Sequence, residues 1–424
     1  MKHLRLSLIA ACAIGALGLP AAAAEEEESA RFQAAVSKVD QNGSALGYTD
    51  LHSLGGECGK MVNMLFKALA LRTGADAETN EMLSKAAGSF VASLNLDAMQ
   101  GFAYSSRSVD GISVNKSYLL FNEAAPKGWL YAFSPWENRP FSMRSMLLPG
   151  TRLAFGGHLQ PAKFYEAFVD AACKTGFDGA SEFREQADAM VLSLTGVPPD
   201  ELLGALDGEF FMMLAETPAA EGGMPGFQGI LALPDRGGVL LKLLEEKGAG
   251  FLEKQEDGSF NIAALNNPEQ KLAPAIIVES DRLVFVSSRE TYQAAKQGNA
   301  SADADTAVYF RDMPEDGHCF LYLNLTRSLV DAVAQALGEE ETVNLVLENV
   351  KLPIVYSVSR TEGNGMLNIC RSNYSFNDLQ TTVPLLCYTA AAFQQFCDDA
   401  DVADVEEEVE TEEDEVEAEA ETAE

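Results

Sequence analysis

Four oxygen-bearing side chains near the start of the chain have types and spacing that suit a calcium loop. They are Asp40, Asn42, Ser44 and Asp50, and the first three occupy alternate positions. Calcium takes about six to eight oxygen ligands, and a tight loop can point alternate residues toward one ion. The pattern departs from the usual loop, because Ala45 stands at the turn glycine and Leu51 at the twelfth position. These residues are therefore a candidate calcium site, with a polar turn between helices as the alternative.

The sequence contains no complete motif for catalysis by histidine or serine. Apart from the candidate calcium ion, no cofactor is expected. The histidines at positions 52, 158 and 318 lack the paired helical spacing of a zinc enzyme. The glycine-rich run at 55–60 lacks the first glycine and the final Ser or Thr of a phosphate-binding loop. A G-x-S-x-G nucleophile elbow is also missing. We therefore expect no catalytic residue among these groups and interpret the histidines as isolated or partly buried.

The segment at 209–213 could support either hydrolysis or binding. Glu209 could act in a hydrolase if a second acid faced it across a cleft, and otherwise it is a strand-edge or capping carboxylate. The next four side chains could line an apolar ligand cavity, although they also suit ordinary core packing. They are Phe210, Phe211, Met212 and Met213.

The elements that must position these residues belong to an α+β fold in which an antiparallel sheet packs on helices. A helical lead-in is expected over 25–96, and from about 97 the apolar period changes to that of strands. Val109-Asp110-Gly111 predicts a hairpin turn, and Trp129 to Phe133 a strand. Helices are expected at 182–194, 238–246 and 290–296. Because hairpins dominate over long crossovers, the sheet should be antiparallel.

The α+β domain, residues 97–397, repeats an order of strand, helix, two strands and helix. The two copies cover about 149–247 and 317–397, and they predict tandem βαββα units, with convergence on alternating strands as the alternative. In the second copy, Asn377 is placed to cap a helix with a kink at Pro384. The apolar stripe of that helix is Leu379, Val383, Leu386, Ala390, Phe393 and Cys397.

Three short motifs carry a resemblance to a known family. They are Leu148-Pro149-Gly150 before a strand, the stretch from Gly196 through Asp200-Glu201-Leu202-Leu203 to Gly208-Glu209-Phe210-Phe211, and Gly229-Ile230-Leu231-Ala232-Leu233 before a helix. Over about residues 145–375 the chain resembles a bacterial exported family described only as a domain of unknown function. The resemblance implies an extracytoplasmic, repeat-like α+β domain and transfers no catalytic residue.

Residues 1–24 have the order of a secretory signal peptide. A basic start is followed by an apolar run at 6–19 and by small residues at 21–24, where cleavage is expected. The run is too short to span about 30 Å of hydrocarbon, so we expect no transmembrane segment after signal removal. The protein should be periplasmic or secreted. Ile9-Ala10-Ala11-Cys12 also resembles a lipoprotein cleavage box, which would leave Cys12 lipidated.

Six cysteines follow the signal peptide, and an even number in an exported chain permits up to three disulfides. Their pairing stays open, and the alternative is that several are small buried hydrophobes. They are Cys58, Cys173, Cys319, Cys370, Cys387 and Cys397.

The acidic composition limits the partners of the protein. Its formal net charge is -34, and residues 398–424 hold sixteen acidic side chains and no Lys or Arg, which predicts a disordered tail. Residues 29–397 still carry a net charge of -16. Nucleic acids are disfavoured because they bind basic surfaces, whereas an apolar ligand or a basic protein surface is compatible. We predict an exported, non-enzymatic binding or structural envelope protein, with a hydrolase that uses an unrecognised carboxylate site as the alternative.

Overall fold

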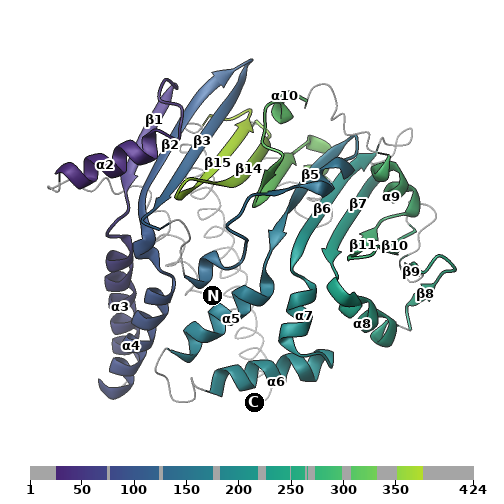
Figure 1. The fold of residues 1–424 in the computed structure, drawn as a ribbon, viewed down its shortest axis with the longest axis horizontal. Helices are drawn as coiled ribbons and strands as arrows, with labels where there is room; N and C mark the ends of the chain where they lie inside the picture. The colour runs from purple at the N-terminus through teal and green to yellow at the C-terminus, as the bar shows by residue number, and fades with distance from the viewer. Residues whose placement is uncertain are drawn as a thin grey trace, which may run out of the picture. The chain divides into compact units, whose positions relative to one another are not determined.

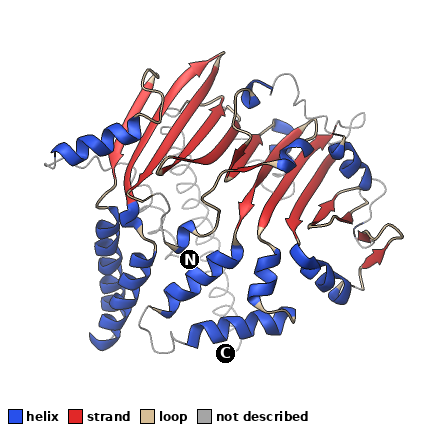
Figure 2. Cartoon of the chain, viewed as in Figure 1, coloured by secondary structure: helices blue, strands red, loops and turns tan. Residues whose placement is uncertain are grey.

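The computed structural model describes residues 25–73, 77–123, 128–174, 182–217, 226–248, 250–262, 265, 273–297, 307–331 and 351–375. Within them, one large antiparallel sheet is accompanied by helices, which gather mainly beside one end of the strands (Figures 1 and 2). The expected combination of antiparallel sheet and helices is confirmed. The predicted signal peptide, with Cys12, and the acidic tail lie outside the described residues.

Among the described residues, thirteen strands form the sheet, and every neighbouring pair is antiparallel. In spatial order they are β1 (Ala45–Asp50), β2 (Met99–Val109), β3 (Ile112–Phe121), β15 (Gly365–Ser372), β14 (Ile354–Glu362), β13 (Cys319–Asn324), β5 (Thr151–Leu159), β6 (Gly208–Thr217), β7 (Gly226–Pro234), β11 (Arg282–Val286), β10 (Ala275–Val278), β9 (Phe260–Ile262) and β8 (Leu252–Lys254). The short strands β4 (Arg139–Pro140) and β12 (Asp316–Gly317) pair separately.

The strand order has the same pattern when it is followed outward from the centre in either direction. β13 and β5 pair at the centre; β14 and β15 follow on one side, and β6 and β7 on the other. A hairpin comes next on each side: β2–β3 beside β15, and β10–β11 beside β7. In the sequence, the hairpin β2–β3 precedes β5, but in the sheet it lies beside β15, which follows β13. Likewise, the hairpin β10–β11 precedes β13 but lies beside β7, which follows β5. The two halves of the chain are therefore interleaved in one sheet.

The helices of the described ranges are α2 (Glu25–Val36), α3 (Leu54–Thr73), α4 (Ala77–Ser93), α5 (Pro161–Cys173), α6 (Phe183–Thr195), α7 (Pro199–Ala205), α8 (Val239–Lys247), α9 (Arg289–Lys296) and α10 (Ala307–Phe310). Short 3-10 turns form at η1 (Leu96–Ala98), η2 (Trp129–Tyr131), η3 (Ser142–Met146) and η5 (Arg236–Gly238). The helices expected at 182–194, 238–246 and 290–296 are confirmed as α6, α8 and α9. The hairpin turn is confirmed too, because Asp110 and Gly111 both have positive φ, as a two-residue type I′ turn requires.

Two sequence-based expectations differ from the structure. The lead-in over 25–96 is helical in α2, α3 and α4, but β1 interrupts it and pairs with β2. The close approach depends on Gly47, because a Cβ there would lie 2.3 Å from the ring of Tyr104. Residues 129–131 form a turn and not a strand, since Trp129 packs edge-on against Phe164 and Phe168 of α5 at 5.6 and 5.5 Å.

One face of the sheet, the core face, carries the main hydrophobic core. Segment 141–148, α9 and α10 contribute residues to this core. The opposite face is called the second face below, and alternate residues of each strand point to it. The core includes Ala154, Phe211, Met213, Ala232, Phe320, Tyr322, Tyr356 and Val358.

Candidate apolar binding face

The structure does not bring the four candidate calcium ligands together. Asp40 lies before β1 and Asp50 ends it, so their carboxylates are separated by a whole strand. Asp40 is paired with Arg107 and Lys116, each at 2.9 Å. Asn42 is exposed, and the Ser44 hydroxyl donates to a backbone carbonyl of β2 at 3.0 Å.

The carboxylate of Asp50 is also occupied. It forms an ion pair with Arg31 at 2.8 Å and accepts a hydrogen bond from the backbone N–H of His52 at 3.0 Å. Burial raises the pKa of Asp50, but these hydrogen bonds outweigh it and hold the pKa below its usual value. In the described part of the chain, no three His, Cys, Asp or Glu side chains gather in a way that could hold a metal ion. Calcium binding at 40–50 stays a prediction, and the geometry does not support it.

Two of the histidines lie side by side at the ends of the central strands. The backbone N–H of His158 donates to the carbonyl of His318 at 2.8 Å, and both side chains are buried. The Nε2 atom of His158 lies 3.1 Å from the carbonyl oxygen of Pro140, so it must carry the proton. Burial lowers the pKa of both imidazoles, which favours the neutral form.

Both histidines help to hold a strap, residues 134–148, which crosses the ends of the central strands and then runs over the core face. His318 Nε2 lies 2.8 Å from the Thr361 hydroxyl, which donates to the carbonyl of Trp136 at 2.5 Å. Glu209 binds the same strap further along. Its carboxylate accepts hydrogen bonds from the Ser142 hydroxyl and, at 3.0 Å, from the backbone N–H of Met143. Glu209 therefore caps η3, and both of its oxygens are engaged.

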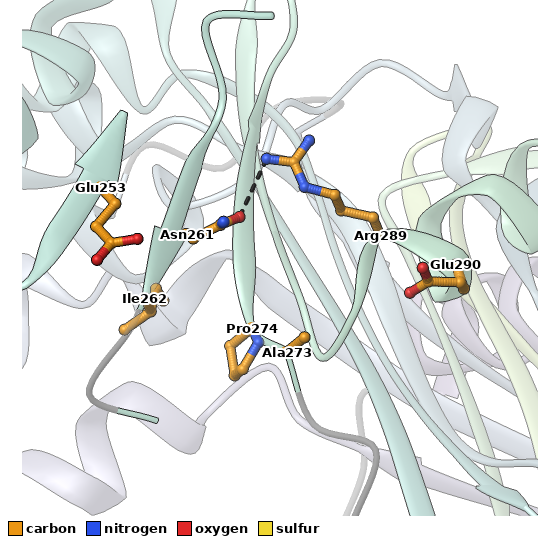
Figure 3. Close-up of a pocket in the computed structure, with 7 residues that line it drawn as sticks. All are labelled: Glu253, Asn261, Ile262, Ala273, Pro274, Arg289 and Glu290. Atoms are coloured by element: carbon orange, nitrogen blue, oxygen red, sulfur yellow. Dashed lines mark hydrogen bonds between the residues drawn. The ribbon is translucent and has the colours of Figure 1, made fainter. Parts of the chain in front are cut away.

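A small pocket of about 180 Å³ lies beside β8, β9 and α9 (Figure 3). Arg289 in its wall is paired with Asp257 at 2.8 Å, donates to Asn261 at 3.1 Å and also bonds Ser259. Pockets for drug-sized ligands measure about 300–1,000 Å³, so only a small molecule would fit. Because the guanidinium is already bonded to three acceptors, it offers little to an incoming anion. The lining residues are Glu253, Asn261, Ile262, Ala273, Pro274, Arg289 and Glu290.

The second face of the sheet carries an unbroken row of apolar side chains across five neighbouring strands. The register places one residue from each strand directly opposite the next, in the order Leu321, Phe155, Met212, Leu231 and Phe285. Leu321 and Met212 are each 37% exposed and Leu231 is 36% exposed, which is unusual for large apolar side chains in central strands. With strands about 4.8 Å apart, this apolar row spans about 19 Å (strands in Figure 1).

A second line of leucines widens the apolar row. Leu323, Leu153 and Leu214 are register partners on β13, β5 and β6, and each is partly exposed. Beyond Leu214, Glu216 marks a polar boundary, where it pairs with Arg152 at 2.7 Å. No residue of the two lines is titratable, so this surface can bind an apolar group but cannot transfer a proton.

The Glu216 cluster also fixes the start of the segment that follows β13. The Ser328 hydroxyl donates to Glu216 at 2.7 Å, and the Thr326 hydroxyl at 3.1 Å. Burial raises the pKa of Glu216, but the ion pair with Arg152 and the hydrogen bonds from the two hydroxyls lower it by more. The pKa of this carboxyl therefore lies below its usual value. The apolar surface therefore ends at an ionised carboxylate that is paired with Arg152 and bonded by two hydroxyls.

The four described cysteines are not bonded to one another. Cys58, Cys173, Cys319 and Cys370 carry free thiols, so no disulfide joins any two of these four, while Cys387 and Cys397 lie outside the described residues.

None of the helices in the described ranges is long and apolar enough to cross a membrane.

Comparison of the chain with protein-family models, with curated proteins and with solved structures gives no match in any of the three. The resemblance of residues 145–375 to an exported family stays a prediction, and the function must be argued from the geometry of the chain itself.

Sequence reasoning singled out Met212 as a cavity-lining candidate but missed its four neighbours in the apolar row. A signal was present, because several strands are apolar at successive positions and not only at alternate ones, as in Phe210-Phe211-Met212-Met213. Such runs indicate strands with apolar groups on both faces. Which side chains share a row depends on pairing between distant segments, which the runs do not reveal.

Proposed function

We propose that this is an exported, non-enzymatic binding protein of a bacterial envelope, which holds an apolar ligand against the second face of its sheet. The observation that carries the proposal is the apolar row, in which three of five large side chains are more than a third exposed. Contiguous exposed apolar surface marks interaction sites, because covering it gains about 25 cal/mol per Å². The flat, uncharged surface suits a flexible apolar group such as an acyl chain.

The hydrogen bonds of Glu209 favour a binding function over hydrolysis. A hydrolase would need a free carboxylate in a cleft, whereas Glu209 uses both oxygens to cap η3. Periplasmic or secreted localisation and the signal peptide at 1–24 remain inferences from the sequence. The acidic tail, which we infer to be disordered, would keep a protein with an exposed apolar surface soluble.

We also infer that the fold arose from tandem units, as the repeats at 149–247 and 317–397 suggest. The interleaved strand order supports this, because β5–β6–β7 and β13–β14–β15 have the same sequential pairing and meet through their first strands. β7 and β15 both begin with glycine, at Gly226 and Gly365. A duplication would make β5 and β13, which carry Phe155 and Leu321 of the apolar row, equivalent strands.

Extraction and titration test the ligand proposal. Protein purified from its envelope fraction should release apolar molecules into organic solvent, and native mass spectrometry should show the corresponding added mass. Titration with N-phenyl-1-naphthylamine, a neutral apolar probe, should show saturable binding. Met212→Gln should weaken this binding by about tenfold, since it replaces an apolar contact worth about 1.4 kcal/mol.

Met190→Gln is the matched control. Met190 lies on α6 and is 61% exposed, so the same substitution changes an exposed methionine outside the apolar row. Its probe affinity should equal that of the unaltered protein. Equal affinities for all three proteins, with no extracted ligand, would reject the carrier function in favour of a structural role.

A further inference from the structure

We propose that the apolar ligand is the tail of an amphiphile whose head group is uncharged, carries hydroxyls and lies over β14, β15 and β3. This inference rests on the proposed function, because it assigns the polar end of the ligand that the apolar row would hold. The site for the head group is called the polar patch below. It consists of the second-face side chains of Ser117, Ser357, Ser359 and Asn368.

The register places the polar patch directly beside the apolar row. Leu321, at one end of the row, pairs with Ser357 on β14. Two residues further along β14, Ser359 pairs with Asn368 on β15, and Asn368 pairs with Ser117 on β3. Directly paired residues point to the same face, and so do alternate residues of one strand. The second face therefore changes from apolar to polar between β13 and β14.

The side chains of the polar patch have hydrogen-bonding groups to offer, and all four residues are partly exposed. The Ser357 hydroxyl donates to Asn368 Oδ1 at 2.8 Å, which leaves the amide NH₂ group of Asn368 to donate elsewhere. Within the described ranges, the hydroxyls of Ser117 and Ser359 have no hydrogen-bond partner. A serine hydroxyl can both donate and accept, as can each hydroxyl of a ligand, so the two kinds of group are complementary.

The charge of the protein argues against an ionised head group. None of the four patch residues is charged, and residues 29–397 carry a net charge of -16, so an anionic head group would be repelled. A cationic head group would find no carboxylate within the patch. Glu216, at the boundary beyond Leu214, is already paired with Arg152 at 2.7 Å. A sugar or a glycerol group meets both conditions, because it is uncharged and bonds through hydroxyls.

The two ends of the surface give the amphiphile one direction. At the β11 end of the apolar row, α8 contributes Leu240, Leu241 and Leu244 to the same apolar cluster as Phe285. A polar head group at that end would lose its hydrogen bonds with water and gain none in return. At the other end, beyond the polar patch, Asn115 is only 4% exposed. The patch therefore has room for a compact head group, and the tail would point toward α8.

Competition among amphiphiles with the same octyl or octanoyl chain tests the head group. Each compound is titrated, below its micelle concentration, against the full chain carrying N-phenyl-1-naphthylamine. Octyl β-glucoside or monooctanoylglycerol should displace the probe at concentrations at least about tenfold below those of octyl sulfate and octyltrimethylammonium, because only uncharged hydroxyls match the patch. The tighter of the first two identifies the head group as a sugar or a glycerol. Equal displacement by all four compounds would overturn the proposal.

Substitutions in the polar patch test the contacts themselves. The double variant Ser117→Ala with Ser359→Ala should bind the preferred octyl compound about tenfold more weakly, with unchanged affinity for the probe. The unchanged probe affinity shows that the variant is folded. The matched control is Ser145→Ala with Ser193→Ala, two exposed serines of η3 and α6 whose hydroxyls donate to backbone carbonyls at 2.9 and 2.8 Å. It should leave both affinities unchanged.

The two proposals fail in different ways. If the patch variant binds the octyl compounds as tightly as the unaltered protein, while the probe still binds, the polar patch holds no head group and the proposed function stands. If the unaltered protein binds neither the probe nor any octyl compound, the apolar row is not a ligand site, and both proposals are rejected.

Discussion

At the scale of single residues, polar side chains hold an irregular segment in place. His158 and His318 bond the strap directly or through Thr361, and Glu209 bonds it through both carboxylate oxygens. Leaving the two buried imidazoles without partners would cost about 1–3 kcal/mol each. His158, His318 and Glu209 therefore all help to position the strap.

The two buried histidines predict acid sensitivity. The pKa of each folded imidazole lies below the unfolded value of about 6.5, so below about pH 6.5 the unfolded chain binds protons that the folded chain does not. The free energy of unfolding should fall as pH decreases from about 6.5 toward the folded pKa values. Burial, the largest influence, and the charge of Arg139 lower the pKa of His158, and together they outweigh Glu209 and the backbone hydrogen bonds at Pro140 and Arg139, which raise it. Urea unfolding at a series of pH values measures the slope.

A double variant, His158→Gln with His318→Gln, should be less stable near neutral pH yet show a shallower slope below it. His52→Gln is the control, because this histidine is exposed, and its slope should match that of the unaltered protein. Identical slopes for all three proteins would contradict a role for the buried imidazoles.

At the scale of elements, close backbone contacts fix where the strap enters the sheet. Gly150, which joins the strap to β5, has φ of 77°, and a Cβ there would lie 2.4 Å from the carbonyl oxygen of Glu216. The Glu216 backbone N–H also donates to the Gly150 carbonyl at 2.9 Å. Only glycine allows both the conformation and the approach.

Gly150→Ala should lower the free energy of unfolding by about 2–4 kcal/mol, since it adds backbone strain and a steric clash. Gly229→Ala is the matched control in β7. Its added Cβ would meet nothing closer than 3.7 Å, so a change within about 1 kcal/mol is expected. Chemical denaturation of both variants measures the difference, and equal stabilities would refute the steric argument.

At the scale of the whole molecule, the acidic residues and the apolar surface lie in different parts of the chain. Residues 398–424 carry sixteen acidic side chains, whereas the apolar row is built by strands between β5 and β13 in the sequence. Like charges in such a tail repel and favour a solvated state. The tail should therefore contribute to solubility or to contact with a basic partner and not to folding.

Truncation after Cys397 should leave the free energy of unfolding within about 0.5 kcal/mol of the full chain. Far-UV circular dichroism per molecule should also be unchanged, because a solvated tail adds no regular structure. Thermal and urea unfolding of the two proteins make the comparison. A loss larger than about 2 kcal/mol would show that the tail packs on the folded domain.

The sequence by itself determined the local elements of this protein, and only the tertiary structure decided which of them meet. The Asp110-Gly111 turn and helices α6, α8 and α9 could be predicted because their signals lie within a few residues of one another. The strand β1 could not, since Gly47 matters only where the ring of Tyr104 lies against it. The apolar row requires Leu321 to face Phe155, a pairing between distant segments. Local periodicity says which side chains share one strand face, but the register between distant strands depends on the packing of the whole sheet.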